Sequence, residues 1–116
     1  MTDDILMAGY DAVHEAMPRS PTLRGLWREH AAGNDFPDEF YHISFVTLAQ
    51  LRWMTAELQA GPGSTIADLG CGTGGPALWM ARETGAGVVG VDLSSTAVAR
   101  ATARASQLGL SDRARF

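Results

Sequence analysis

The chain has 116 residues, of which 46% are hydrophobic and 19% charged, a composition that predicts one modest soluble core. The net charge is −4 and every basic side chain is an arginine, which argues against nucleic acid as a partner because few cations would meet phosphates. One cysteine excludes an intrachain disulfide, and no apolar run is long enough to cross a bilayer. An acidic N-terminus without a continuous apolar stretch is unlike a signal peptide, so we expect a cytoplasmic protein.

A helix is the first element that the sequence predicts. Apolar side chains near the N-terminus recur at spacings of four, three and four residues, which places them on one helix face. The residues of this stripe are Leu6, Tyr10, Val13 and Met17. We expect the stripe to be buried against the rest of the chain.

A second, short helix is predicted to follow Ser20. The Ser20 side chain suits the N-cap position, and Pro21 suits the first turn of a helix. This helix is expected to bury Leu23, Leu26 and Trp27. The turn-forming residues at 31–37 then predict a loop.

The third predicted helix is the longest and spans about residues 38–59. Its main apolar stripe comprises Phe40, Ile43, Thr47, Leu51, Met54 and Leu58. Three further apolar side chains, Phe45, Leu48 and Trp53, fall outside that stripe. We therefore expect this helix to pack between two partners.

A glycine- and proline-containing break at residues 60–64 separates this helical part from an alternating part. The predicted order is a strand at 64–69, a helix at 76–84, a strand at 88–92, a helix at 95–108 capped by Ser94 or Ser95, and the opening of a strand at 112–116. Alternation of this kind predicts an α/β fold with a parallel sheet whose buried strands are covered on both faces. The domain division that we predict is a helical cap at 1–60 and an α/β domain at 61–116.

A glycine-rich loop joins the first predicted strand to the helix after it. Gly70, Gly72 and Gly74 are spaced to leave backbone N–H groups open to a ligand. Asp68 and Asp92 end the first and second strands, so both carboxylates lie at one edge of a parallel sheet. A carboxylate at the second strand end suits a ribose diol. Loop hydrogen bonding is the alternative role for both aspartates, and it requires two coincidences at one edge.

Two cofactor classes are compatible with this loop. Gly70-x-Gly72-x-x-Gly75, with Asp92 further on, also satisfies the dinucleotide pattern of NAD-dependent oxidoreductases. Asp68 argues against that class, because a pyrophosphate close to a carboxylate is repelled. A ligand that carries an ammonium and a sulfonium group gains from the same carboxylate. S-adenosylmethionine has both groups and no phosphate.

The segments "IADLGCGTGG", "VVGVDLS" and "ASQLGLSDRARF" together resemble the first half of a class I S-adenosylmethionine-dependent methyltransferase domain. The resemblance covers residues 64–116 and is closest to bacterial small-molecule and natural-product methyltransferases. It implies a Rossmann-like, doubly wound sheet and methyl transfer to an oxygen, nitrogen or carbon nucleophile of a small molecule.

The resemblance also implies roles for individual residues. The acidic glycine segment would wrap the cofactor, Asp92 would hold the ribose hydroxyls, Leu93 would pack on the adenine, and the N-terminal helix would close over the site. The residues implied are Asp68, Gly70, Cys71, Gly72, Thr73, Gly74, Asp92, Leu93 and Tyr10. Without a neighbouring histidine in the sequence, Cys71 is expected to contribute its backbone and not a nucleophile.

The sequence also offers three candidates for a general base. His42, Tyr41 and His14 are candidates for deprotonating an acceptor, and surface or helix-end positions are the more common role for such residues. The spacing of the histidines predicts no metal site.

The chain stops where the third strand begins, whereas the methyltransferase family usually has seven strands. We therefore expect either a truncated domain that is inactive alone, which we favour, or a sheet that another component completes. In both cases the first strand has an unpaired edge within this chain. Such an edge suits a homodimer, and a non-catalytic fragment that associates through it is the third functional hypothesis.

Overall fold

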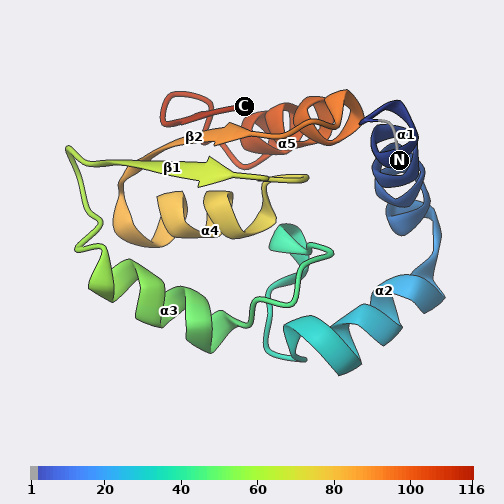
Figure 1. Cartoon of the computed structure of the whole chain (residues 1–116). Helices are drawn as coiled ribbons and strands as arrows, with labels where there is room; N and C mark the ends of the chain where they lie inside the picture. Colours follow the sequence, from blue (N-terminus) through green and yellow to red (C-terminus); the bar gives the residue numbers. More distant parts are fainter. Residues whose placement is uncertain (1–2) are drawn as a thin grey trace.

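The computed structural model describes residues 3–116, which form five α-helices and a three-stranded sheet (Figure 1). The helices are α1 (Asp3–Ala16), α2 (Pro21–Trp27), α3 (Leu48–Glu57), α4 (Gly75–Thr84) and α5 (Ser95–Gln107), and the strands are β1 (Thr65–Leu69), β2 (Gly87–Val91) and β3 (Ala114–Arg115). Short 3₁₀ turns at Met17–Arg19 and Asp38–Phe40 and a π-helical turn at Arg28–Ala32 complete the helical content. None of the helices in this described range is both long and apolar enough to span a membrane.

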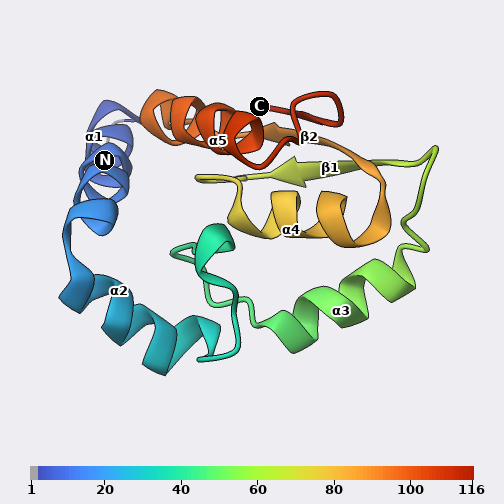
Figure 2. The same ribbon diagram turned by 180° about the vertical axis from the view of Figure 1, so that it is seen from behind.

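The sheet is parallel, as predicted, and its order is β1-β2-β3. Right-handed crossovers between consecutive neighbours place both α4 and α5 on the same face, and Figure 2 shows α5 in front of β2. The prediction that both faces are covered is wrong for the described residues. Val88 is buried under the helices, whereas Val89 and Val91 on the opposite face are about half exposed.

The hydrophobic core lies between the sheet, α4 and α3. Leu78 and Ala81 of α4 are fully buried, and Leu51 of α3 packs in the same cluster with Val88 of β2. Phe40, from the 3₁₀ turn, is also fully buried. The segment before β1 is therefore anchored against α4, which brings residues 38–47 close to the beginning of that helix.

The third helix begins ten residues later than predicted, at Leu48. A capping box sets this start: the Gln50 N–H donates to Thr47 Oγ1 at 3.2 Å, and the Thr47 N–H donates to Gln50 Oε1 at 2.9 Å. The Thr-x-x-Gln spacing was the signal that could have located it. Residues 41–47 instead form a loop, which Trp27 holds through a 2.9 Å hydrogen bond from Nε1 to the Ser44 carbonyl oxygen.

The prediction for the apolar stripe of α1 is mostly wrong. Leu6, Tyr10 and Val13 are 42–54% exposed, and Met17, which lies just after the helix, is the member that is buried. The residue that α1 buries is His14, at 4% exposure. Helix α1 stands at the side toward which the β1 arrow points in Figure 1, and none of its residues belongs to the core cluster.

The predicted starts and ends of the other helices are confirmed where turn chemistry determines them. Ser20 caps α2 by accepting from the Leu23 N–H at 3.1 Å, and Ser94 caps α5 by accepting from the Ala97 N–H at 3.0 Å. Gly85 ends α4 in the left-handed conformation. The prediction that Leu26 is buried is wrong, because its side chain on α2 is 51% exposed.

Candidate functional site

The glycine loop turns sharply from β1 into α4. Gly70 and Gly72 have φ angles of +75° and +54°, which residues other than glycine rarely adopt. The N–H groups of Gly70 and Cys71 both donate to the Val91 carbonyl oxygen, at 2.8 and 2.9 Å. These two hydrogen bonds hold the first residues of the glycine loop against Val91, the last residue of β2.

Asp92 joins this loop to the start of α5. Its Oδ2 accepts from the Gly72 N–H and its Oδ1 accepts from the Ser94 N–H, both at 2.8 Å. Asp92 therefore does form the loop hydrogen bonds that the sequence analysis treated as the alternative role for this residue. Each carboxylate oxygen can accept more than one hydrogen bond, so these contacts are compatible with binding a ribose diol as well.

Asp68 lies half-buried at the end of β1, on the same cavity as Asp92. Burial raises the pKa of its carboxyl group, and the nearby Asp92 charge raises it further. Within residues 3–116, neither aspartate takes part in an ion pair. Two uncompensated carboxylates near each other favour a cationic ligand and disfavour an anionic one.

A cavity of about 1000 Å³ opens over the loop and the strand ends. This volume lies at the upper end of the range for small-molecule sites. The cavity brings together most of the residues that the sequence analysis singled out: Tyr10, His14, His42, Asp68, Gly70, Cys71, Gly72, Thr73, Asp92 and Leu93. No arginine is among the described residues that line it.

Two of the predicted residues, Gly74 and Tyr41, do not line this cavity. A Cβ atom on Gly74 would meet Ala101 Cβ at 3.0 Å, so Gly74 serves close packing against α5. The Tyr41 carbonyl oxygen accepts from Arg104 Nη1 at 2.9 Å, and the Arg104 guanidinium lies 4.3 Å from the centre of the Tyr41 ring. Tyr41 instead lines a second cavity of about 340 Å³.

Helix α1 covers the glycine loop through Asp11, which the sequence analysis did not assign, and through His14, which it named as a candidate base. The Ser94 hydroxyl donates to the Asp11 carboxylate, which fastens α1 to the beginning of α5. His14 lies over the loop, its Cε1 3.5 Å from the place a Cβ would take on Gly72. Burial lowers the pKa of His14 despite the nearby Asp92 and Asp11.

Cys71 is buried in the loop, and its chemistry agrees with the expected backbone role. Burial, together with the charges of Asp68 and Asp92, raises the pKa of the thiol to about 11. A thiol with that pKa is protonated near neutral pH and is a poor nucleophile.

His42 is the other buried histidine of the cavity wall, at 7% exposure. Its Nδ1 is 3.1 Å from the donating Ser44 N–H and 2.9 Å from the Ser44 hydroxyl. Burial, and secondarily the positive charge of Arg104, lower the pKa of His42 to about 4. The ring is therefore neutral at physiological pH.

The low pKa of His42 predicts a pH-dependent stability. Between about pH 6.5 and pH 4 the unfolded chain binds a proton that the folded chain does not, so the stability from this group is complete above pH 6.5 and is lost as the pH falls. We expect the free energy of unfolding of the unmodified chain to fall more steeply over this interval than that of His42→Asn. Urea unfolding at a series of pH values measures both slopes, and equal slopes would contradict the prediction.

The parallel sheet, the glycine loop and the cavity at the strand ends define a Rossmann-like cofactor-binding domain. Residues 66–116 match a family model described as a methyltransferase domain. The methyltransferase GfsG of Streptomyces halstedii is 42% identical over 59 residues, which are 51% of this chain and 21% of that protein. The 27-O-demethylrifamycin SV methyltransferase of Amycolatopsis mediterranei is 30% identical over 108 residues, which are 93% of this chain and 38% of that protein.

A solved structure agrees with these relatives. The SAM-dependent methyltransferase from Geobacter sulfurreducens, in complex with S-adenosyl-L-homocysteine, superposes with a TM-score of 0.54 and 37% identity over 60% of this chain and 28% of that one. Over residues 66–116 the chain is therefore similar to the methyltransferase domain of S-adenosylmethionine-dependent enzymes. It spans about a fifth to two fifths of the length of the relatives compared.

Proposed function

We propose that the protein transfers a methyl group from S-adenosylmethionine to an oxygen, nitrogen or carbon nucleophile of a small molecule. The observation that carries this proposal is the pair Asp68 and Asp92, which flank the glycine loop without an ion-pair partner among residues 3–116. Their charge attracts the ammonium and sulfonium of this cofactor and repels the pyrophosphate of a dinucleotide. The relative from Amycolatopsis mediterranei, whose name specifies 27-O-demethylrifamycin SV, supports a small-molecule acceptor.

The residues of the cavity fit the parts of this cofactor. Asp68 would accept from the ammonium group, and Asp92 would accept from the ribose hydroxyls with the lone pairs that Gly72 and Ser94 leave free. Leu93, which is 73% exposed at the cavity edge, offers an apolar surface for the adenine. The bound cofactor supplies an electrophilic methyl group for in-line displacement. The chain itself contributes orientation and exclusion of water.

The N-terminal helices are proposed to act as a lid at residues 1–60 over the cofactor domain at residues 61–116. The contact of Asp11 with Ser94 and the position of His14 over Gly72 support this division of labour. Tyr10 also lines the cavity and is half exposed there, where it can contact the cofactor. The acceptor would then bind between the lid and the glycine loop.

The cellular setting that we propose is the bacterial cytoplasm. A single cysteine and the bacterial origin of the relatives described above support it. The acidic net charge supports small molecules as ligands in preference to nucleic acid. Pairing of two chains through the β1 edge is the homodimer that we propose.

Asp68→Asn is expected to weaken binding of S-adenosylhomocysteine by about 10- to 100-fold, because a hydrogen bond between charged groups becomes one with a neutral amide. Isothermal titration of the unmodified chain and the variant measures the difference. Asp112→Asn, at an exposed position beyond α5, is the matched control and should leave the affinity unchanged. Binding of NADH without S-adenosylhomocysteine would overturn the proposed function and favour an NAD-dependent oxidoreductase.

A further inference from the structure

We propose that the cavity between α2 and residues 33–41 binds a small aromatic molecule that carries one carboxylate. This is the second cavity, of about 340 Å³, and it shares only His42 with the cavity over the glycine loop. Its volume lies at the lower end of the range for small-molecule sites. The site goes beyond the proposed function, because none of its lining residues is assigned to the cofactor.

Aromatic side chains form much of the lining of this cavity. Trp27 belongs to α2, and the segment after the π-helical turn contributes Phe36, Tyr41 and His42. Phe36 is 3% exposed, and its ring meets the His42 ring edge to face, with 4.4 Å between ring centres. Aromatic rings attract one another in stacked and edge-to-face arrangements, so these walls suit a planar aromatic ligand.

Hydrogen bonds and an ion pair hold these walls in place. Arg28 Nη2 donates to the Phe36 carbonyl oxygen at 2.8 Å and lies 2.6 Å from Asp38 Oδ1. Trp27 Nε1 donates to the Ser44 carbonyl oxygen at 2.9 Å, which fixes the indole ring. A cavity that is already formed binds a small ligand at a lower entropic cost than one that the ligand must order.

The charge of the lining indicates an anionic group on the ligand. The charged lining residues are Arg24, Arg28 and Asp38, and the ion pair with Arg28 compensates Asp38. Arg24 forms no ion pair within residues 3–116, and its guanidinium lies over the Tyr41 ring, 5.8 Å from the ring centre. A guanidinium beside an aromatic wall can donate two parallel hydrogen bonds to a carboxylate.

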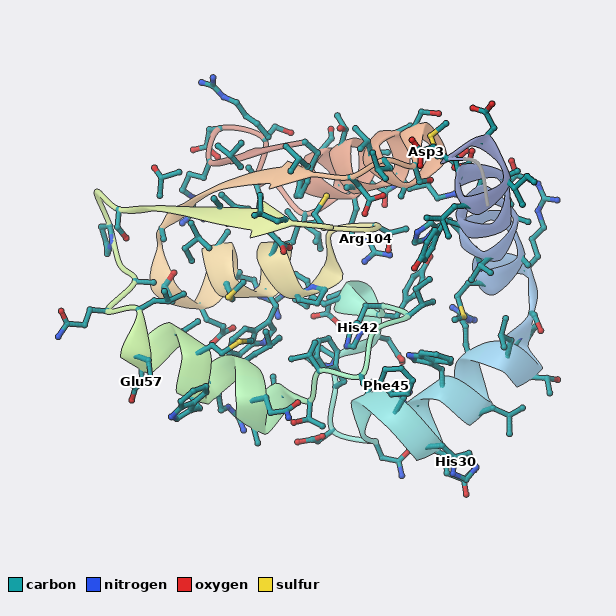
Figure 3. The ribbon with its side chains drawn as sticks, viewed as in Figure 1. Asp3, His30, His42, Phe45, Glu57 and Arg104 are labelled. Atoms are coloured by element: carbon teal, nitrogen blue, oxygen red, sulfur yellow. The ribbon has the colours of Figure 1, made fainter. Side chains whose placement is uncertain are left out.

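A second guanidinium contacts the same aromatic ring. Arg104 of α5 is 8% exposed, lies 4.3 Å from the centre of the Tyr41 ring, and also lacks an ion pair within residues 3–116. Figure 3 shows Arg104 and His42 in the interior of the molecule. Asp35, which lies close to Gly33, does not line the cavity. The local charge therefore favours an anion near Arg24.

Three probes separate the two parts of this ligand: benzoate, its neutral isostere benzamide, and acetate, which has no ring. We expect the unmodified chain to bind benzoate about fivefold or more tightly than either other probe, as an ion pair at the cavity wall contributes up to about 1 kcal/mol. Titrations followed by ¹H–¹⁵N spectra measure these affinities. The indole N–H signal of Trp27 should move with benzoate, whereas that of Trp53, which lines neither cavity, should stay.

Arg24→Gln should weaken benzoate binding about fivefold and leave benzamide binding unchanged, because only benzoate pairs with the guanidinium. Arg19→Gln is the matched control for net charge, since Arg19 is exposed and lines neither cavity. Benzoate affinity should not change in this control. Saturation with S-adenosylhomocysteine should also leave benzoate binding unchanged, because the ligands occupy different cavities.

Four results would overturn the proposed site. They are equal loss of benzoate affinity in the two arginine variants, equal binding of benzoate and benzamide, a Trp27 signal that does not move, and competition between benzoate and S-adenosylhomocysteine. The benzoate titrations themselves require no cofactor, and Arg24→Gln should leave the affinity for S-adenosylhomocysteine unchanged. The second site and the proposed function can therefore fail separately.

Discussion

Gly75→Ala is expected to lower the free energy of unfolding by about 3 kcal/mol, a large loss for a single methyl group. A Cβ atom on Gly75 would stand 2.2 Å from the Phe40 carbonyl oxygen and 2.7 Å from the Tyr41 carbonyl oxygen. Both obstacles are backbone atoms, and Arg104 holds the second of them by a hydrogen bond. The clash therefore forces α4 away from the 3₁₀ turn at 38–40 and cannot be relieved by a side-chain rotation.

Urea unfolding, followed by circular dichroism, measures this effect. Gly25→Ala in α2 is the matched control, because nothing lies within 4 Å of the added methyl group. That control should leave stability unchanged or raise it by about 1 kcal/mol, since alanine favours the helix over glycine. If the two variants were equally stable, that result would contradict the close contact between the backbone of residues 40–41 and the first residue of α4.

Asp92→Ala is expected to weaken binding of S-adenosylhomocysteine by about 100-fold or more. The substitution removes the carboxylate that accepts from Gly72 and Ser94, and it also removes the acceptor proposed for the ribose hydroxyls. Hydrogen bonds to a charged group contribute about 1.5–3 kcal/mol each, so losing two of them at the site accounts for a change of this size. Isothermal titration of the chain with S-adenosylhomocysteine measures it.

The role of Asp92 in the loop and its role toward the ribose can be separated. A ligand without the ribose hydroxyls, 2′,3′-dideoxyadenosine, should lose less affinity than adenosine does when Asp92 is replaced. Asp112→Ala removes an exposed carboxylate and serves as the control for net charge. Equal losses for the two nucleosides would mean that Asp92 acts through the loop alone.

Local patterns in the sequence were sufficient for the α/β half of the fold. The short β-branched run at 87–91, the glycines after β1 and the caps at Ser94 and Gly85 each act on neighbouring backbone, so their structural effect is readable without knowing what lies nearby. The alternation of strands and helices then determined a parallel sheet. For the same reason, Asp68 and Asp92 were predicted at one sheet edge, and both line the cavity there.

The N-terminal third was predicted less well because its structure depends on distant contacts. Helical periodicity continued through residues 38–47, but the chain there forms a loop that Trp27 and Arg104 hold from other helices. The apolar stripe of α1 indicated burial, yet the helix is positioned by Asp11 on Ser94, a polar contact across 83 residues. No local pattern encodes a contact of that kind.

By itself, the sequence determined a glycine loop between two acidic strand ends, because strand, turn and helix signals act over a few residues. The tertiary structure alone decided which side chains complete the cavity. In the folded chain His14 and His42 are buried, and Tyr41 and Gly74 do not line the cavity. Asp92 also accepts a hydrogen bond from the glycine loop. Burial and long-range hydrogen bonds depend on how the elements pack, and packing brings together residues whose sequence spacing carries no signal.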